Sequence, residues 1–260
     1  VDLIKAAGAV PGIKVDAGAQ DLAGGKGIEK VTEGLDGLRG RLQEYHQLGA
    51  RFAKWRSVIT IADGLPSHNC LHANAHGLAR YAALCQENGI VPIVEPEVLM
   101  DGDNSSHTIE KCYGVTEWTL NEVFRELYYA GVNLEGMILK PNMVIAGQKC
   151  PTQATPAQVA EQTIKCLKAT VPSSVPGIAF LSGGQSDLLA TEHLSLMNAA
   201  GDLPWALTFS YGRALQAAAL KAWGGKSENV AAGQRAFAHR AAMNGKAALG
   251  QWQNSLENAA

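Results

Sequence analysis

Short apolar runs alternate with helical segments along the chain, and this alternation restricts the possible folds more than any other feature. The runs expected to form strands cover residues 12–16, 51–61, 90–94, 134–140, 178–182 and 205–210. The interior runs are continuously apolar, which is typical of strands buried on both faces of a sheet. Strands that alternate with helices favour parallel β-α-β units. The sequence therefore predicts an α/β fold around a parallel sheet.

The segments between these runs have helical periodicity and helix-boundary residues. The expected helices cover residues 35–48, 70–88, 105–130, 155–170, 188–199 and 213–223, and the chain is Ala-rich and helical from 229 onward. Thr155 is an N-cap candidate with Pro156 at the first helical position, and Thr108 or Ser106 would start the long helix. Gly89 is expected to stop the second helix.

The number of units predicts a barrel whose first part is not in this sequence. Six strand–helix units are expected, whereas a closed (β/α)8 TIM barrel has eight. The chain begins at Val1 rather than methionine and enters a strand almost at once. We therefore expect a (β/α)8 barrel whose first two strands are absent from this chain. Because no linker divides the sequence, residues 1–260 are expected to form a single barrel domain, incomplete at its N-terminus, with a helical tail from about residue 227.

Composition and charge exclude several classes of function. Hydrophobic residues make up 47% of the 260 residues and charged residues 18%, which allows a large core. The formal net charge is −2 and no basic run stands out, so nothing indicates binding to nucleic acid. No apolar stretch approaches the ~20 residues that span a bilayer, and no signal peptide opens the chain. The five cysteines lack paired metal spacing and are expected to be reduced thiols in a cytoplasmic protein.

A lysine at the end of one buried strand is the strongest candidate for a catalytic residue. The run 134–140 ends in Lys140, and Pro141 stops the strand directly after it. In a parallel barrel the carboxyl ends of the strands open into the active site. A neutral amine at that place can attack a carbonyl carbon and form a Schiff base. The alternative is a lysine that caps a strand end in solvent, but Lys14 and Lys54 also end strands and favour the first interpretation.

Charged residues at other strand ends are expected to converge with Lys140 on one mouth of the barrel. Side chains two residues apart on a strand point to the same side, so Lys54 can share a face with Arg56, and Glu95 with Glu97. The neighbouring cations would favour the neutral amine of Lys140. Glu95 would transfer protons while the amine adds to a carbonyl and water leaves. The alternative for Lys54, Arg56 and Glu97 is a buried ion-pair network.

Two glycine-rich turns follow the last two strands and precede helices. The turns are Ser182-Gly183-Gly184 and Ser210-Tyr211-Gly212-Arg213. Glycine lets backbone amides approach a ligand closely, helix N-termini favour an anion, and Arg213 adds a forked donor. Two such turns at neighbouring strand ends predict a phosphate site, which barrel enzymes often place there. The alternative is that each turn is only a tight loop.

Three histidines repeat at every fourth position of one expected helix: His68, His72 and His76. The stripe could indicate a metal site, but it offers no ligand of another type and lies away from the strand ends. Metal sites usually take converging ligands from several elements. We therefore expect neither a metal nor a cofactor.

The chain resembles class I fructose-bisphosphate aldolase, the metal-independent type that acts through a Schiff base. The resemblance covers essentially the whole chain and keeps the family's order of motifs. The motifs are GIKVD at 12–16, LDGL at 35–38, FAKWR at 52–56, IVPIVEPE at 90–97, LKPNM at 139–143, FLSGGQS at 180–186 and WALTFSYGRA at 205–214.

The resemblance implies a role for each matching position. Lys140 would be the Schiff-base lysine, Glu95 the proton donor and acceptor of imine formation, and Lys54 a neighbour that assists. Lys14 would bind substrate, and Arg56 would help at the distal phosphate. The two turns would hold the phosphate nearest the ketone carbon. The expected substrate-binding residues are Lys14, Arg56, Glu97, Ser182, Gly183, Gly184, Ser210, Gly212 and Arg213.

The resemblance also implies an activity: the reversible aldol cleavage of fructose 1,6-bisphosphate to dihydroxyacetone phosphate and glyceraldehyde 3-phosphate, in glycolysis and gluconeogenesis. It implies a cytoplasmic homotetramer that binds a phosphorylated sugar and needs no metal or cofactor. One alternative is another Schiff-base lyase or transferase acting on sugar phosphates. The other is a catalytically impaired or non-enzymatic binding protein on the aldolase fold. Intact Lys140, Glu95 and Lys54 count against this last alternative, and the absent first strands count for it.

Overall fold

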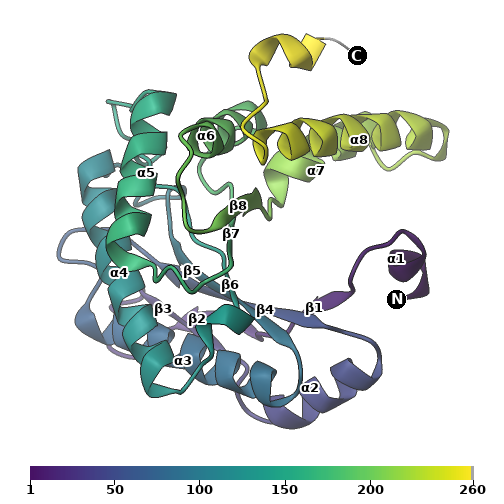
Figure 1. The fold of residues 1–260 in the computed structure, drawn as a ribbon. Helices are drawn as coiled ribbons and strands as arrows, with labels where there is room; N and C mark the ends of the chain where they lie inside the picture. Colours follow the sequence, from purple (N-terminus) through teal and green to yellow (C-terminus); the bar gives the residue numbers. More distant parts are fainter. Residues whose placement is uncertain (259–260) are drawn as a thin grey trace.

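A six-stranded parallel sheet forms the centre of the molecule, with its strands arranged along an arc (Figure 1). The computed structural model describes residues 1–258; residues 259 and 260, the end of the predicted domain, lie outside the described residues. In sheet order the strands are β1 (Gly12–Lys14), β4 (Phe52–Ile59), β5 (Val91–Val98), β6 (Ile138–Leu139), β7 (Gly177–Phe180) and β8 (Ala206–Phe209). Every neighbouring pair is parallel. The predicted parallel α/β sheet is therefore confirmed.

Helices follow the strands in turn and pack on the outside of the arc (Figure 1). They are α2 (Leu38–Gln47), α3 (His68–Glu87), α4 (Ile109–Tyr129), α5 (Pro156–Thr170), α6 (Asp187–Ala199) and α7 (Arg213–Trp223). A short helix, α1 (Asp2–Ala6), precedes β1, and α8 (Val230–Ala247) packs against α6 and α7. Single 3-10 turns cover Leu134–Gly136, Ser227–Asn229 and Asn254–Asn258.

Side-chain caps mark the starts of α3, α4, α5 and α6. The hydroxyl of Thr108 accepts from Lys111 N, so Thr108 rather than Ser106 starts α4. Thr155 and Gln158 form a reciprocal capping box at α5, with Pro156 at the first helical position as predicted. A cap of this kind stabilises a helix by about 1 kcal/mol. These local signals explain why the helix starts could be located from the sequence.

Two predicted boundaries are wrong in an informative way. The run 134–140 was expected to be one strand, but its first residues form a 3-10 turn because the side chain of Asn133 accepts from Glu135 N. The strand that follows, β6, has only two residues. The strand expected at 90–94 continues to Val98, so Glu95 and Glu97 lie within β5 rather than after it.

An antiparallel hairpin after β1 was not predicted. It pairs β2 (Gly18–Asp21) with β3 (Lys30–Glu33), and most of its residues are exposed or half-buried. Because the hairpin buries so little apolar surface, its sequence lacks the continuous apolar run that identifies the other strands. The hydroxyl of Thr32 donates to Arg56 O, which ties the hairpin to β4.

The core lies between the sheet and its outer helices. Trp55 of β4 is fully buried and packs against Tyr81 of α3, with ring centroids 5.6 Å apart. Tyr81 donates its hydroxyl to Ile93 O of β5, so the helix is fixed to two neighbouring strands. All five cysteines are buried free thiols, as predicted, and burial raises the pKa of Cys70 and Cys85 to about 12.

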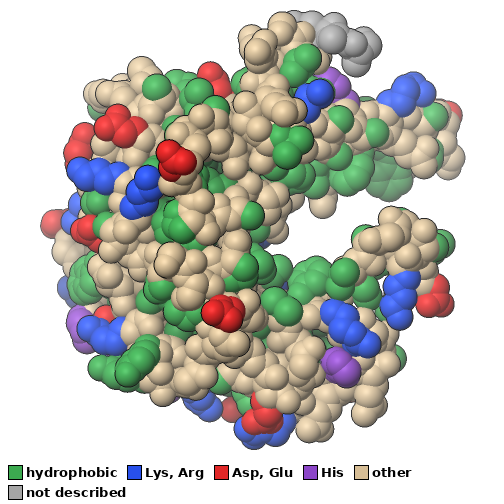
Figure 2. Space-filling view, in the orientation of Figure 1, with side chains coloured by type: hydrophobic (Ala, Val, Ile, Leu, Met, Phe, Trp, Pro, Cys, Tyr) green, Lys and Arg blue, Asp and Glu red, His purple; other side chains and the backbone are tan. Residues whose placement is uncertain are grey.

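The molecule is hollowed where the N-terminal segment around α1 faces α7 and α8 (Figure 2). β1 and β8, the first and last strands of the sheet order, lead to these two sides. Half-exposed apolar side chains line a pocket between α7 and α8, among them Leu220, Trp223 and Phe237. In the described part of the chain, no helix combines the length and hydropathy that a bilayer crossing requires.

Candidate active site

Three charged side chains from neighbouring strands meet in the sheet. Lys140 Nζ, at the end of β6, lies 3.0 Å from Glu95 Oε1 of β5. Lys54 Nζ of β4 lies 2.9 Å from Glu95 Oε2, so the one carboxylate contacts both amines. Lys140 is 8% exposed and Glu95 3%. The structure therefore brings together the three residues that the sequence marks as candidates for catalysis.

Backbone pairing places Lys140 beside Glu95. The two residues of β6 pair with Ile93 and Val94 of β5, and Lys140 N donates to Val94 O at 2.8 Å. Pro141 cannot donate a hydrogen bond, so it does not continue this ladder. Lys140 is thus one position past the strand and is still held to β5 by its backbone N–H.

This cluster can perform acid–base chemistry on a bound carbonyl compound. A general acid or base must lie within hydrogen-bond reach of the proton that it transfers, and Glu95 lies that close to both amines. The side chain of Lys140 is largely shielded from water. A low exposure to water strengthens the charge interactions inside the site. A nucleophilic amine with a carboxylate beside it is the arrangement that Schiff-base formation needs.

Arg56 and Glu97 form a second ion pair next to this cluster. Arg56 Nε lies 2.5 Å from Glu97 Oε2, and Glu97 is buried. Burial alone would lower the pKa of the Arg56 guanidinium, but the hydrogen bond and the charge of Glu97 raise it above its ordinary value. The ion-pair interpretation of these two residues is thus supported by their geometry, although Arg56 remains partly accessible to a ligand.

Lys14 extends the row of cations to the first strand of the sheet. β1 pairs with β4 so that Lys14 is opposite Lys54. Its ammonium group lies 2.5 Å from Asp16 Oδ1, and its side chain is half exposed. The buried Asp16 also accepts from Arg56 N at 3.2 Å, which fixes the end of β1 against β4. Lys14 is therefore accessible to a ligand, whereas Asp16 has a structural role.

The two glycine-rich turns lie next to each other, as predicted. β7 pairs with β8, and this pairing continues to the start of the second turn, where Ser210 N donates to Phe180 O at 2.9 Å. Gly184 has φ of +73°, and a Cβ there would lie 2.5 Å from Met100 Cβ. A Cβ on Gly183 would lie 3.1 Å from Glu97 Oε1. The first turn therefore needs glycine for its close packing against the end of β5.

Arg213 already has a partner that the sequence did not reveal. It is the first residue of α7, and its Nη2 lies 2.6 Å from Asp101 Oδ2. Asp101 comes shortly after the end of β5, so the available signal was another carboxylate close to a strand end. Gly212 forms the N-cap of α7, which leaves the first amides of that helix near the same position.

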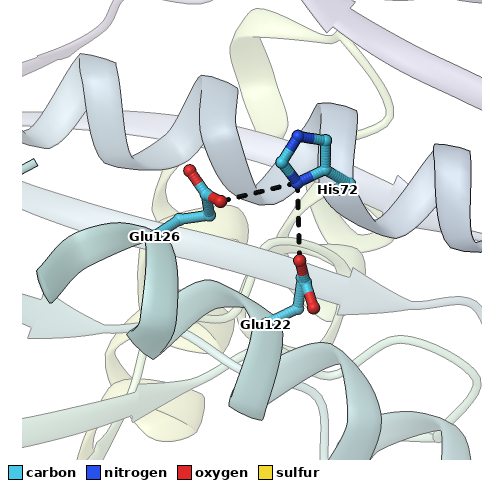
Figure 3. A group of neighbouring side chains, drawn as sticks. All are labelled: His72, Glu122 and Glu126. Atoms are coloured by element: carbon cyan, nitrogen blue, oxygen red, sulfur yellow. Dashed lines mark ion pairs between the residues drawn. The ribbon is translucent and has the colours of Figure 1, made fainter. Parts of the chain in front are cut away.

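The histidine stripe of α3 faces carboxylates, contrary to the expectation that it meets no other type of ligand. His72 Nδ1 lies 3.5 Å from Glu122 Oε1 and 3.4 Å from Glu126 Oε1, both on α4 (Figure 3). The expectation is therefore wrong for His72. Glu122 and Glu126 are four residues apart on the next helix, a spacing that could have indicated a facing pair.

Comparison with known proteins gives a consistent result. A family model described as "Glycolytic: Fructose-bisphosphate aldolase class-I" matches residues 1–260. A probable fructose-bisphosphate aldolase class 1 of Xanthomonas campestris pv. campestris is 60% identical over 95% of this chain and 73% of its own length. A cytosolic fructose-bisphosphate aldolase 4 of Arabidopsis thaliana is 52% identical over 99% of this chain and 65% of its own length.

A solved structure shows the same arrangement of elements. Fructose-bisphosphate aldolase from Plasmodium falciparum, crystallised with TRAP and a small-molecule inhibitor, matches with a TM-score of 0.94 and 49% identity. The match covers 97% of this chain and 72% of that chain. Together with the six parallel strands, this likeness confirms the predicted (β/α)8 fold class.

Proposed function

Because this chain belongs to the class I fructose-bisphosphate aldolase family, we propose that Lys140, Glu95 and Lys54 perform the chemistry of that family. The activity is the reversible aldol cleavage of fructose 1,6-bisphosphate to dihydroxyacetone phosphate and glyceraldehyde 3-phosphate, a carbon–carbon lyase reaction of glycolysis. The observation that carries the proposal is the contact of 3.0 Å between the buried amine of Lys140 and Glu95 Oε1.

Lys140 acts as the nucleophile. Its neutral amine adds to the ketone carbon of the sugar, and Glu95 gives a proton to the carbinol oxygen so that water leaves and an iminium ion forms. Loss of the proton from the hydroxyl next to the scissile bond then releases the aldehyde product. The electron pair of the broken carbon–carbon bond moves to the iminium nitrogen, giving an enamine. Protonation at carbon and hydrolysis release dihydroxyacetone phosphate and restore the amine.

Lys54 supports the proton transfer by its contact with the other oxygen of Glu95, 2.9 Å away. A positive charge there favours the carboxylate form of Glu95, which takes the proton from the attacking amine. After Glu95 has taken that proton, it is the acid required for loss of water. In this proposal the charge of Lys54 stabilises the carboxylate stage and makes protonated Glu95 the stronger proton donor for the loss of water.

Substrate binding is assigned to the charged and glycine-rich groups around this centre. Lys14, Arg56 and Glu97 lie on β1, β4 and β5, where Arg56 would help to hold the distal phosphate and Lys14 and Glu97 would bind the substrate. The adjacent turns after β7 and β8 would hold the phosphate nearest the ketone carbon through backbone amides, hydroxyls and a guanidinium group. The residues proposed for that phosphate are Ser182, Gly183, Gly184, Ser210, Gly212 and Arg213.

We further propose that the protein is a cytoplasmic homotetramer with one barrel domain per chain, and that its catalysis is metal-independent. The support is its family membership and the cytosolic designation of plant relatives. Sedimentation analysis tests the assembly: four chains of 27.4 kDa predict a fourfold mass. A mass of one or two chains at working concentrations would contradict the tetramer.

The decisive experiment combines turnover with chemical trapping. The purified protein is expected to cleave fructose 1,6-bisphosphate, and borohydride reduction with dihydroxyacetone phosphate should attach the triose to Lys140, as shown by peptide mass mapping. Lys140→Ala should lose both signals. Lys168→Ala, which removes an exposed lysine of α5, is the matched control and should retain them.

The possible outcomes separate the alternatives. Trapping without cleavage of fructose 1,6-bisphosphate would indicate a different Schiff-base enzyme for sugar phosphates. Neither trapping nor cleavage would indicate a non-enzymatic protein on the aldolase fold. An adduct on Lys14 or Lys54 would show that the wrong lysine has been assigned as nucleophile.

A further inference from the structure

Two outer helices bring a histidine and two carboxylates together away from the strand ends. His72 projects from α3, and Glu122 and Glu126 project from consecutive turns of α4 (Figure 3). Their Nδ1 and carboxylate oxygen atoms all lie within 4.8 Å of one another. Glu122 is 3% exposed, and Glu126 is also buried. The aldol mechanism uses none of these groups.

Each carboxylate has one oxygen held by a cationic or titratable side chain and the other directed at His72. Glu122 Oε2 pairs with Arg125, while Glu122 Oε1 has no hydrogen-bond partner among residues 1–258. Glu126 Oε2 lies 3.0 Å from His76 Nδ1, while Glu126 Oε1 points to His72. In metal sites, a second side chain typically binds the ligand atom that faces away from the ion, as Arg125 and His76 bind these carboxylates.

The distances within the cluster suit ligands around an ion better than hydrogen bonds. The separations of His72 Nδ1 from the two carboxylate oxygens are 3.4 and 3.5 Å, beyond the usual N–H···O range of about 2.7–3.2 Å. Bonds of about 2.0–2.1 Å to a tetrahedral Zn²⁺ place neighbouring ligand atoms roughly 3.3–3.4 Å apart. The two separations from His72 Nδ1 therefore already match the spacing of neighbouring ligands of such an ion, and the two carboxylate oxygens lie within 4.8 Å of each other.

We propose that His72, Glu122 and Glu126 bind a divalent transition-metal ion between α3 and α4, with Zn²⁺ as the best-suited ion. Imidazole nitrogen and carboxylate oxygen are both zinc ligands, and a mixed set of this kind disfavours Ca²⁺ and Mg²⁺, which prefer oxygen alone. Half-exposed His72 leaves the ion one side open to solvent, where water completes the coordination.

Charge gives an independent reason for a cation at this position. Two buried carboxylates within 4.8 Å of each other repel, and a buried charge is costly unless it is paired. Arg125 contacts only one of them, at its outer oxygen. A divalent ion would neutralise both carboxylates and would join the two helices that cover β5.

Titration of the full chain with Co²⁺ and Zn²⁺ after removal of metal tests this proposal. Co²⁺ reports binding by its visible absorption, which is strong for four-coordinate ions, and Zn²⁺ should displace it at one ion per chain. Glu122→Gln and His72→Asn should each weaken binding about tenfold or more. The matched control is His68→Asn, which changes the histidine one turn earlier on α3 and should leave the affinity unchanged.

Zinc should also raise the thermal midpoint of the wild-type chain and of His68→Asn, because a ligand that binds the folded state stabilises it. Retained aldol cleavage verifies that each variant is folded. Equal Co²⁺ affinity in wild type and His72→Asn would overturn the proposal. So would the absence of saturable binding in the wild type, which would leave the cluster as a histidine shared between two carboxylates.

Discussion

Arg213 Nη2 lies 2.6 Å from Asp101 Oδ2, so the arginine assigned to the substrate phosphate is paired with a carboxylate that follows strand β5. The Arg213 side chain is 74% exposed, and ion pairs at such exposure contribute at most about 1 kcal/mol. A dianionic phosphate can therefore replace or share this partner at little cost. Asp101 keeps Arg213 near the glycine-rich turns before substrate binds.

Arg213→Ala should weaken turnover of a ketose phosphate by roughly ten- to a hundredfold or more. A charge-assisted hydrogen bond contributes on the order of 1.5–3 kcal/mol, which corresponds to that range. Arg213→Lys should give an intermediate loss because it restores the charge but not the forked geometry. Steady-state rates on the natural substrate, and on an analogue without the phosphate nearest the ketone, measure the effect. Equal losses on both substrates would mean that Arg213 maintains the fold or the imine site instead.

Glu95→Gln should slow imine formation by about 10²- to 10⁴-fold, the usual contribution of general acid–base catalysis. The amide is of similar size but cannot accept the proton of the attacking amine, although both lysines remain. The rate of borohydride trapping at saturating dihydroxyacetone phosphate measures this step. Glu97→Gln, two residues along the same strand, serves as comparison and should change the affinity for substrate more than the trapping rate. An undiminished trapping rate in Glu95→Gln would require another proton donor.

Chelators should leave aldol cleavage unchanged. Both oxygens of Glu95 already contact lysine amines, which occupy the positions that a metal ion would need at that carboxylate. The proposed ion at His72 lies between outer helices, so its removal should lower the thermal midpoint and not the rate. The measurement is turnover before and after prolonged dialysis against EDTA. Loss of activity that zinc restores would contradict the imine mechanism.

Folding stability should fall as the pH is lowered from about 6.5 towards 4 because of His193. This histidine is buried in α6 and donates from Nδ1 to Gln185 Oε1 at 2.6 Å. Desolvation by burial lowers its pKa from 6.5 to about 4. Between these pH values the unfolded chain binds the proton and the folded chain does not, so acidification favours unfolding. The loss would reach roughly 3 kcal/mol at the low end.

Urea unfolding at pH 7 and at pH 4.5 measures this dependence, and His193→Gln, which cannot be protonated, should show less of it. Burial also lowers the pKa of His107, so some dependence of the same sign should remain in the variant. If wild type and His193→Gln lost stability in parallel, His193 would not be the source.

The parts of the molecule with continuous apolar runs could be predicted from the sequence, and those with few apolar residues could not. Strand β5 shows the first case. The apolar run 90–94 identified this strand, and its register with β4 determines which charged residues lie side by side. The hairpin β2–β3 shows the second case, because its side chains are mostly exposed.

Within the site, residues that mark the end of one strand could be predicted, but contacts between side chains of different elements could not. Lys140 could be predicted from a strand that ends in lysine and proline. Asp101 was missed, because a carboxylate close to a strand end does not by itself show that α7 approaches the end of β5. Glu122 and Glu126 were missed for the same reason, because the partner histidine lies on another helix about 50 residues earlier.

Lys54, Glu95 and Lys140 are held by adjacent strands of one hydrogen-bonded ladder, whereas the groups assigned to the phosphate come from turns. The two parts of the site can therefore change independently during evolution. Insertions and substitutions in the turns can alter which sugar phosphate is accepted without moving the amine and carboxylate. New substrate ranges in this lineage should consequently appear as differences in the segments after the strands, with the strand residues retained.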